Sequence, residues 1–160
     1  MASSPAEMVG ATDQPVTLAA NRTTADLAVR QPTGPAKQAL AATAKRPHAY
    51  LNLENITSSG VPASYAVYLN LPDKADPKQN DHLLAGLLPA FGVAEASRAD
   101  KHSAGSGLHH ALNVTKVIEE LEQRGQWNPQ KLTVTFIPRN AGSDPIPVKV
   151  GRVSLYYKDP

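Results

Sequence analysis

The sequence predicts a mainly β fold, a two-sheet antiparallel β-sandwich with one short amphipathic helix. Three observations lead to this prediction. Apolar and polar residues alternate with the period of a strand in six or seven segments, and a helical period occurs in only one. Loops containing glycine or proline separate these segments. A chain of 160 residues, of which 41% are hydrophobic, is long enough for one core of ordinary size.

The clearest strand patterns begin after residue 47. Leu51 and Leu53 alternate with polar residues in segment 50–56, and segment 63–71 is too apolar to have one fully wet face. Because a turn-like stretch joins the two, they predict a long hairpin. Residues 131–139 have the most regular alternation in the chain. Residues 146–157 continue the pattern with a one-residue slip of phase at Gly151, which predicts a bulge.

Two further strands and the helix lie between these segments. The apolar run 82–93 contains Gly86 and Pro89, which favour a bent or bulged strand, and residues 109–114 predict another strand. The helix is predicted to begin with Thr115 as its N-cap and to stop at Gly125. Its apolar residues recur at helical spacing: Val114, Val117, Ile118 and Leu121.

The first 47 residues have a different character. Prolines interrupt every helical period, and only residues 15–18 and 26–30 read as extended, the latter as a half-buried edge strand. Residues 33–45 read as a flexible linker, with a short helix after Pro35 as the alternative. The sequence therefore predicts an extended N-terminal segment, 1–47, with one or two short strands, followed by a β-sandwich domain, 48–160.

Composition excludes several classes of function. A formal charge of +2 is too small to create the field that tracks phosphates, so no nucleic-acid partner is expected. The absence of cysteine excludes disulfides and thiolate metal sites. No apolar run approaches the roughly 20 residues that span a bilayer, so no membrane partner is expected. The start of the chain shows no signal peptide. The sequence predicts a soluble chain and leaves its compartment open.

No catalytic residue, metal ligand or cofactor is predicted. The five histidines, His48, His82, His102, His109 and His110, have poor spacing for a metal site, because His109 and His110 on a strand point to opposite faces. The serine in Gly105-Ser-Gly107 lacks the strand-to-helix context of a nucleophile elbow. Glu119, Glu120 and Glu122 spread over a solvated helix face.

Four tyrosines on predicted strands are the candidate partner-facing residues: Tyr65, Tyr68, Tyr156 and Tyr157. Tyr65 and Tyr68 differ by three positions, and Tyr156 and Tyr157 by one, so each pair is expected to point to opposite faces of a sheet. At least two rings should be buried. The others should lie at a surface, either as ordinary rim residues or presented to another domain.

Six segments, in this order, resemble the C-terminal domain of bacterial tyrosinase-like (polyphenol oxidase, type-3 copper) proteins. They are YLNLENIT (50–57), YAVYLNLP (65–72), AGLLPAFG (85–92), HSAGSGL (102–108), LTVTFIPR (132–139) and VGRVSLYY (150–157). The resemblance implies a β-sandwich that packs over a copper site and shields it, while the histidine-bearing domain performs catalysis. No segment of this chain matches the copper-ligand motifs of that domain.

Two functional hypotheses follow. In the first, the chain is a non-catalytic β-sandwich that covers or stabilises a tyrosinase-type copper domain of the same or a separate chain. The chain is then no enzyme by itself, although its parent protein is expected to be a tyrosinase-like copper oxidase. In the second, the chain is a structural module that forms a homo-oligomer through its strand edges and its N-terminal segment.

Overall fold

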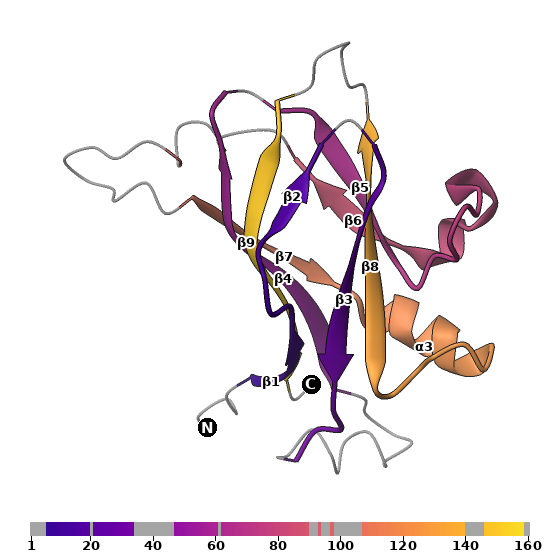
Figure 1. The fold of residues 1–160 in the computed structure, drawn as a ribbon. Helices are drawn as coiled ribbons and strands as arrows, with labels where there is room; N and C mark the ends of the chain where they lie inside the picture. The colour runs from indigo at the N-terminus through magenta and orange to yellow at the C-terminus, as the bar shows by residue number, and fades with distance from the viewer. Residues whose placement is uncertain are drawn as a thin grey trace.

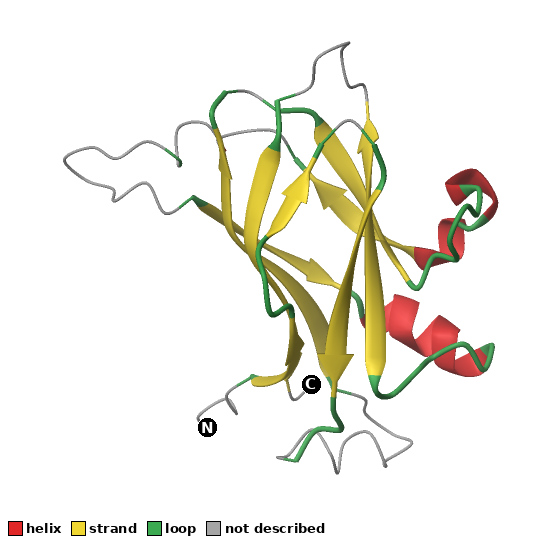
Figure 2. Ribbon diagram, in the orientation of Figure 1, coloured by secondary structure: helices red, strands yellow, loops and turns green. Residues whose placement is uncertain are grey.

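Nine strands of one antiparallel sheet make up most of the fold in this computed structural model (Figure 1). The structure describes residues 6–19, 21–33, 47–60, 62–89, 93, 97, 107–139 and 146–158. The strands are β1 (Glu7–Ala11), β2 (Val16–Leu18), β3 (Thr23–Val29), β4 (His48–Ser58), β5 (Ser64–Leu69), β6 (Leu84–Leu88), β7 (Leu108–Asn113), β8 (Lys131–Arg139) and β9 (Val148–Lys158). The helix α3 (Thr115–Gln123) and the 3₁₀ turns η1 (Pro77–Gln79) and η2 (Asp81–Leu83) complete the described elements (Figure 2).

The strands are connected in the order β6-β5-β8-β3-β1-β9-β4-β7, and β2 pairs with β9 beyond the end of β1. The prediction of a mainly β, antiparallel fold with one short helix is confirmed. The two layers of the expected sandwich are one continuous sheet, which curls into a nearly closed barrel. The reason lies in β3 and β1, which continue the ladder from β8 across to β9.

The barrel stops short of closure between β6 and β7. No ladder joins these two strands, but the His110 Nε2 atom lies 3.1 Å from the Leu87 carbonyl oxygen. A Cβ atom on Gly86 would lie only 2.8 Å from a methyl group of Leu112, so the two strands meet closely there. The predicted bulge in this region is also confirmed, because the β5–β6 register shifts between Val67 and Tyr68.

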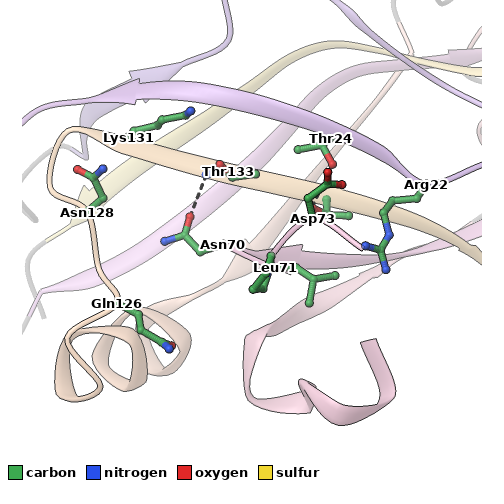
Figure 3. Close-up of a pocket in the computed structure, with 11 residues that line it drawn as sticks. Arg22, Thr24, Asn70, Leu71, Asp73, Gln126, Asn128, Lys131 and Thr133 are labelled. Atoms are coloured by element: carbon green, nitrogen blue, oxygen red, sulfur yellow. Dashed lines mark hydrogen bonds between the residues drawn. The ribbon is translucent and has the colours of Figure 1, made fainter. Parts of the chain in front are cut away.

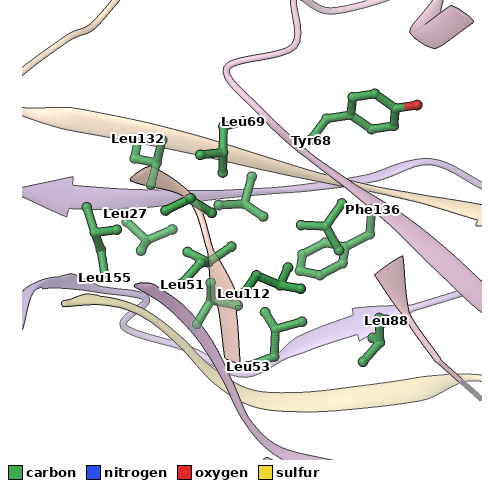
Figure 4. Packing of buried hydrophobic residues seen from close by; sticks show 14 of the residues in the cluster. Leu27, Leu51, Leu53, Tyr68, Leu69, Leu88, Leu112, Leu132, Phe136 and Leu155 are labelled. Carbon is green, nitrogen blue, oxygen red and sulfur yellow. The ribbon is translucent and has the colours of Figure 1, made fainter. Parts of the chain in front are cut away.

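The interior of the barrel is filled by alternate residues of the strands. Leu27, Leu132 and Phe136 have no exposed surface and belong to one cluster (Figure 4). The residues on either side of Leu27 are exposed. The helix α3 adds Ile118 and Leu121 to this core. At about 25 cal/mol for each Å² of apolar surface removed from water, this burial is the main favourable contribution to folding.

The N-terminal segment is a structural part of the barrel. Strand β3 lies between β8 and β1, so the expectation of an edge strand at residues 26–30 is wrong. Leu27 and Val29 face the core, while Asp26 and Ala28 face solvent, and this half-burial produced the edge-like pattern. Strand β1 was not foreseen. The predicted linker at residues 33–45 lies, except for Thr33, outside the described residues.

The predicted hairpin between residues 50 and 71 does not form. Strand β4 pairs with β7 and β9, whereas β5 pairs with β6 and β8. The two strands therefore lie apart in the sheet. The two strands are close in sequence, which favours a hairpin. Each of them instead has a different strand on either side, so neither edge is left for the other.

The slip of phase at Gly151 is real, but it is shared by the neighbouring strand. Opposite Gly151 lies Asn55, which has a φ of +53°, and a Cβ atom on Gly151 would lie 2.8 Å from that of Asn55. Both strands change phase together, so the β4–β9 register is the same on either side. The shift appears instead in the ladder between β4 and β7.

Helix α3 agrees with the sequence prediction to within one residue at either end. Its N-cap is Val114 instead of Thr115. The Asn113 Oδ1 atom accepts a hydrogen bond of 3.1 Å from the Thr115 N–H, and the Thr115 hydroxyl accepts one of 2.9 Å from Ala49 N–H on β4. Gly125, with a φ of +68°, ends the helix as predicted.

Candidate interaction surface

Tyr65 lies inside the barrel. Its side chain has no exposed surface, and its hydroxyl donates a hydrogen bond of 3.1 Å to the Ala19 carbonyl oxygen. Burial raises the pKa of this hydroxyl. Tyr65 therefore cannot face a partner in this fold, which corrects the sequence prediction for this residue. The cause is its alternation with Val67 and Leu69, both fully buried on the same side of β5.

Tyr68 points to the opposite side of β5. Figure 4 shows its ring directed away from the cluster that contains Phe136. It is 8% exposed, and burial raises the pKa of its hydroxyl, with a further increase from the Asp81 carboxylate. The expected separation of Tyr65 and Tyr68 onto two faces is present. Tyr68 is largely covered, although it lies on the outside of the barrel.

Tyr156 and Tyr157 also separate onto two faces. Tyr157 is 5% exposed and belongs to the core, so it too is removed from the partner-facing candidates. Tyr156 is half-buried on the outside of β9, where it lies between Met8 of β1 and Tyr50 of β4. Of the four candidate tyrosines, Tyr68 and Tyr156 are the two on the outer surface.

Apolar side chains surround Tyr68 on the outside of strands β6, β5 and β8, although Ala66 and Tyr68 are themselves buried. Two cross-strand rows form it: Leu87 opposite Ala66 and Ala66 opposite Ile137, then Leu84 opposite Tyr68 and Tyr68 opposite Thr135. Leu84 and Leu87 are 37% and 43% exposed. We call this surface the apolar face, defined by Ala66, Tyr68, Leu84, Leu87 and Ile137.

A polar groove of about 560 Å³ continues from the apolar face across β8 and β3 (Figure 3). Asn70 anchors it at the end of β5. Its N–H donates to the Thr133 carbonyl oxygen at 2.7 Å, and its Oδ1 accepts from the Thr133 N–H at 3.0 Å. Arg22 donates to the Ala75 carbonyl oxygen at 2.6 Å and holds the segment after β5 against β3. Asp73 and Lys131 also line the groove, which therefore has polar groups of both charges.

The outside of β9 and β4 is of another kind, and we call it the polar face. Glu54 and Arg152 lie opposite one another and form a two-point ion pair, with N–O distances of 2.7 and 2.9 Å. The buried Ser154 hydroxyl donates to the same carboxylate at 2.7 Å. These interactions, led by the hydrogen bond from Arg152, hold the pKa of Glu54 below its ordinary value despite the opposing effect of burial.

The histidines do not gather into a site in the part of the chain that the structure describes. No three side chains of His, Asp, Glu or Cys type there are placed to hold a metal ion. His109 and His110 are neighbours on β7 and lie on opposite faces, with His110 directed to Leu87 of β6. His102 lies outside the described residues. Among those residues there is also no helix that could span a membrane.

Comparison with known proteins shows the family of the chain. A family profile described as a domain of unknown function (DUF7868) matches residues 5–158. The chain belongs to this family. It is also 29% identical, over 151 residues, to tyrosinase HcTyr1 of Hahella sp. (strain CCB-MM4). That match covers 94% of this chain and 32% of the tyrosinase, so the chain spans about a third of the length of this relative.

Two solved structures share the fold. A recombinantly expressed latent aurone synthase, a polyphenol oxidase, superimposes with a TM-score of 0.55 at 19% identity over 91% of this chain and 26% of that one. Latent apple tyrosinase gives a TM-score of 0.55 at 16% identity over 91% of this chain and 27% of that one. The matched region is the C-terminal portion of these proteins. The resemblance to the C-terminal domain of tyrosinase-family proteins is thereby confirmed.

Sequence reasoning named Tyr68 but missed the leucines around it. The signal was present, because residues on β6 that lie opposite outward residues of β5 must also point outward. This rule applies only once the partner of β5 is known, and the sequence alone does not show that β5 pairs with β6 or that β6 starts at Leu84. The 3₁₀ turn at 81–83 includes residues 82 and 83, the first two of the segment predicted as a strand.

Proposed function

We propose that this chain is a non-catalytic accessory domain that packs against a tyrosinase-type copper domain and covers or stabilises it. The observation that supports this most directly is the unequal coverage of the match to tyrosinase HcTyr1, which spans nearly all of this chain and a third of that protein. The larger part of the relative lies outside the match. A domain of this type has a neighbour to pack against in the same polypeptide.

The histidine content of the chain supports a role without catalysis of its own. A type-3 copper pair uses six histidines, and this chain has five. Imidazole is a suitable ligand for copper, but a binuclear site also requires several rings directed to one point. His109 and His110 are adjacent in sequence and lie on opposite faces of β7, so they cannot both bind one ion there without distortion of the strand.

The test of this proposal uses a chimera in which this chain replaces the matched region of tyrosinase HcTyr1. We expect the chimera to unfold at a higher temperature than the same tyrosinase with the region deleted, because a docked domain stabilises its neighbour. The isolated chain with copper and a diphenol should oxidise no faster than copper alone. An oxidation rate that is proportional to the amount of folded isolated chain, and that is lost in His109→Ala, would contradict the proposal.

Self-association is the second candidate function, and the exposed leucines of the apolar face favour it. The strand edges offer less support, because the free edges of β6 and β7 lie against each other. Sedimentation of the isolated chain distinguishes the two proposals. A discrete homo-oligomer that does not stabilise the copper domain would support the second.

A further inference from the structure

We infer that the apolar face is the surface by which this chain docks on the tyrosinase-type copper domain. The inference rests on the proposed function and adds to it the residues that make the contact. It commits to one occupant, a tyrosinase-type copper domain, because two thirds of the tyrosinase relative lie outside the match in the same polypeptide.

Exposure of large apolar side chains identifies the face. In the part of the chain that the structure describes, three large hydrophobic residues are exposed: Met8, Leu84 and Leu87. Two of the three lie together on β6. In the cross-strand row that starts at Leu87, Ala66 on β5 is buried and Ile137 on β8 is half-buried. Large exposed apolar side chains that lie together mark interaction sites, and Leu84 and Leu87 are such a pair. Met8 lies in one cross-strand row with Tyr156 and Tyr50, which are both half-buried, and has no second exposed large hydrophobic neighbour among the described residues.

The surroundings of the face have the composition of an interface rim. Asp81 and Arg139 lie close enough to Tyr68 to act on the pKa of its hydroxyl, which Asp81 raises and Arg139 lowers. The polar groove begins where Thr135, opposite Tyr68, meets Thr24 of β3, with 3.4 Å between their hydroxyl oxygens. An apolar centre with charged and hydrogen-bonding groups at its margin is the usual arrangement of a protein–protein interface.

The size of the face favours a tethered partner over a second copy of the chain. Stable complexes between free proteins bury about 1,200–2,000 Å² of total surface, and two exposed leucines with their neighbours supply only a small apolar centre. A domain joined to its partner by a linker meets it at an effective concentration in the millimolar range, so a weak contact is sufficient. The tyrosinase relative carries the matched region and the remaining two thirds of its length in one polypeptide.

The experiment is small-angle scattering on the chimera with HcTyr1 and on two variants of it. In the double variant Leu84→Asp, Leu87→Asp, each charge would be buried without a partner at the contact, and we expect loss of the compact state. In the control Met8→Asp, a residue of 38% exposure on another face receives the same charge, and the chimera should stay compact. Leu87→Ser serves as a milder second variant if the double variant does not fold.

Three outcomes overturn the inference. A compact double variant would remove the contact from the apolar face and leave the proposed function standing, and an extended Met8→Asp variant beside it would place the contact on the other side of the barrel. An extended wild-type chimera would refute the proposed function itself. An isolated chain that forms a dimer, and becomes monomeric with Leu84→Asp and Leu87→Asp, would assign the face to a second copy.

Discussion

The apolar face and the polar face lie on the outside of the same sheet, yet their side chains differ in how far they find partners within the chain. On the polar face, Glu54 is held by Arg152 and Ser154, so its charge is compensated within the chain. On the apolar face, Leu84 and Leu87 keep more than a third of their surface in water.

This difference indicates for which surface the free energy falls most when a partner covers it. Covering the polar face would remove water from an ion pair and would cost free energy unless a partner replaced those interactions. Covering the apolar face would remove hydrocarbon from water, which stabilises a complex without any requirement for matching charge. The comparison therefore supports docking through β6, β5 and β8.

The largest effect is expected from the interior behind the apolar face. Phe136→Ala should lower the free energy of unfolding by roughly 3–5 kcal/mol, because Phe136 is fully buried and its removal leaves a large cavity. Ile137→Ala, one residue further and half-buried on the outside, should cost about 1 kcal/mol. Urea denaturation of the two variants measures the difference. Equal losses would show that the outer side of β8 is as well packed as the inner side.

The polar face should make the stability of the chain depend on pH. Because the folded pKa of Glu54 lies below its ordinary value of 4.5, its stabilisation is present above that value and is lost as the pH falls through the folded pKa. Glu54→Gln should therefore cost about 1 kcal/mol at pH 7 and almost nothing in more acidic solution, below the folded pKa. Thermal unfolding across this range checks the prediction, and a cost that does not change with pH would contradict it.

A loss of similar or smaller size is expected at Tyr65. Tyr65→Phe removes the donor to the Ala19 carbonyl oxygen and should cost about 1 kcal/mol. Tyr156→Phe is the control, since Tyr156 is half-buried at the surface and should change stability by less than about 0.5 kcal/mol. If both variants unfold at the same temperature as the parent chain, the hydrogen bond inside the barrel contributes nothing measurable.

The smallest effect on stability is expected from the apolar face itself. Leu87→Ser in the isolated chain should change the free energy of unfolding by less than about 0.5 kcal/mol, because its side chain is 43% exposed. The measurement is chemical denaturation beside Met8→Ser as control. A loss of several kcal/mol would mean that Leu87 supports the barrel and is not available to a partner.

Local patterns in the sequence predicted the elements well where each element has one buried side. Strands β8 and β9 and helix α3 have regular periods, and they lie within two residues of their predicted bounds. The opposite directions of Tyr65 and Tyr68 also followed from the period of a strand alone.

The pairing of strands could not be predicted in the same way. Strand β3 pairs with β8, which lies about a hundred residues further along the chain, and no local pattern reports such a partner. For the same reason β4 and β5 were joined as a hairpin and the barrel was taken for two sheets. The candidate surface was missed with them, because Leu84 and Leu87 become one face with Ala66 and Ile137 only when the strand order is known.

Hydrogen–deuterium exchange on the isolated chain and on the chimera with HcTyr1 tests the central claim most directly. We expect segments 64–69 and 84–88 to exchange more slowly in the chimera, because docking on the apolar face would cover them. Segments 48–58 and 148–158, which include the polar face, should exchange equally in both. Slower exchange confined to the polar face, or equal exchange everywhere, would contradict the assignment of the apolar face as the docking surface.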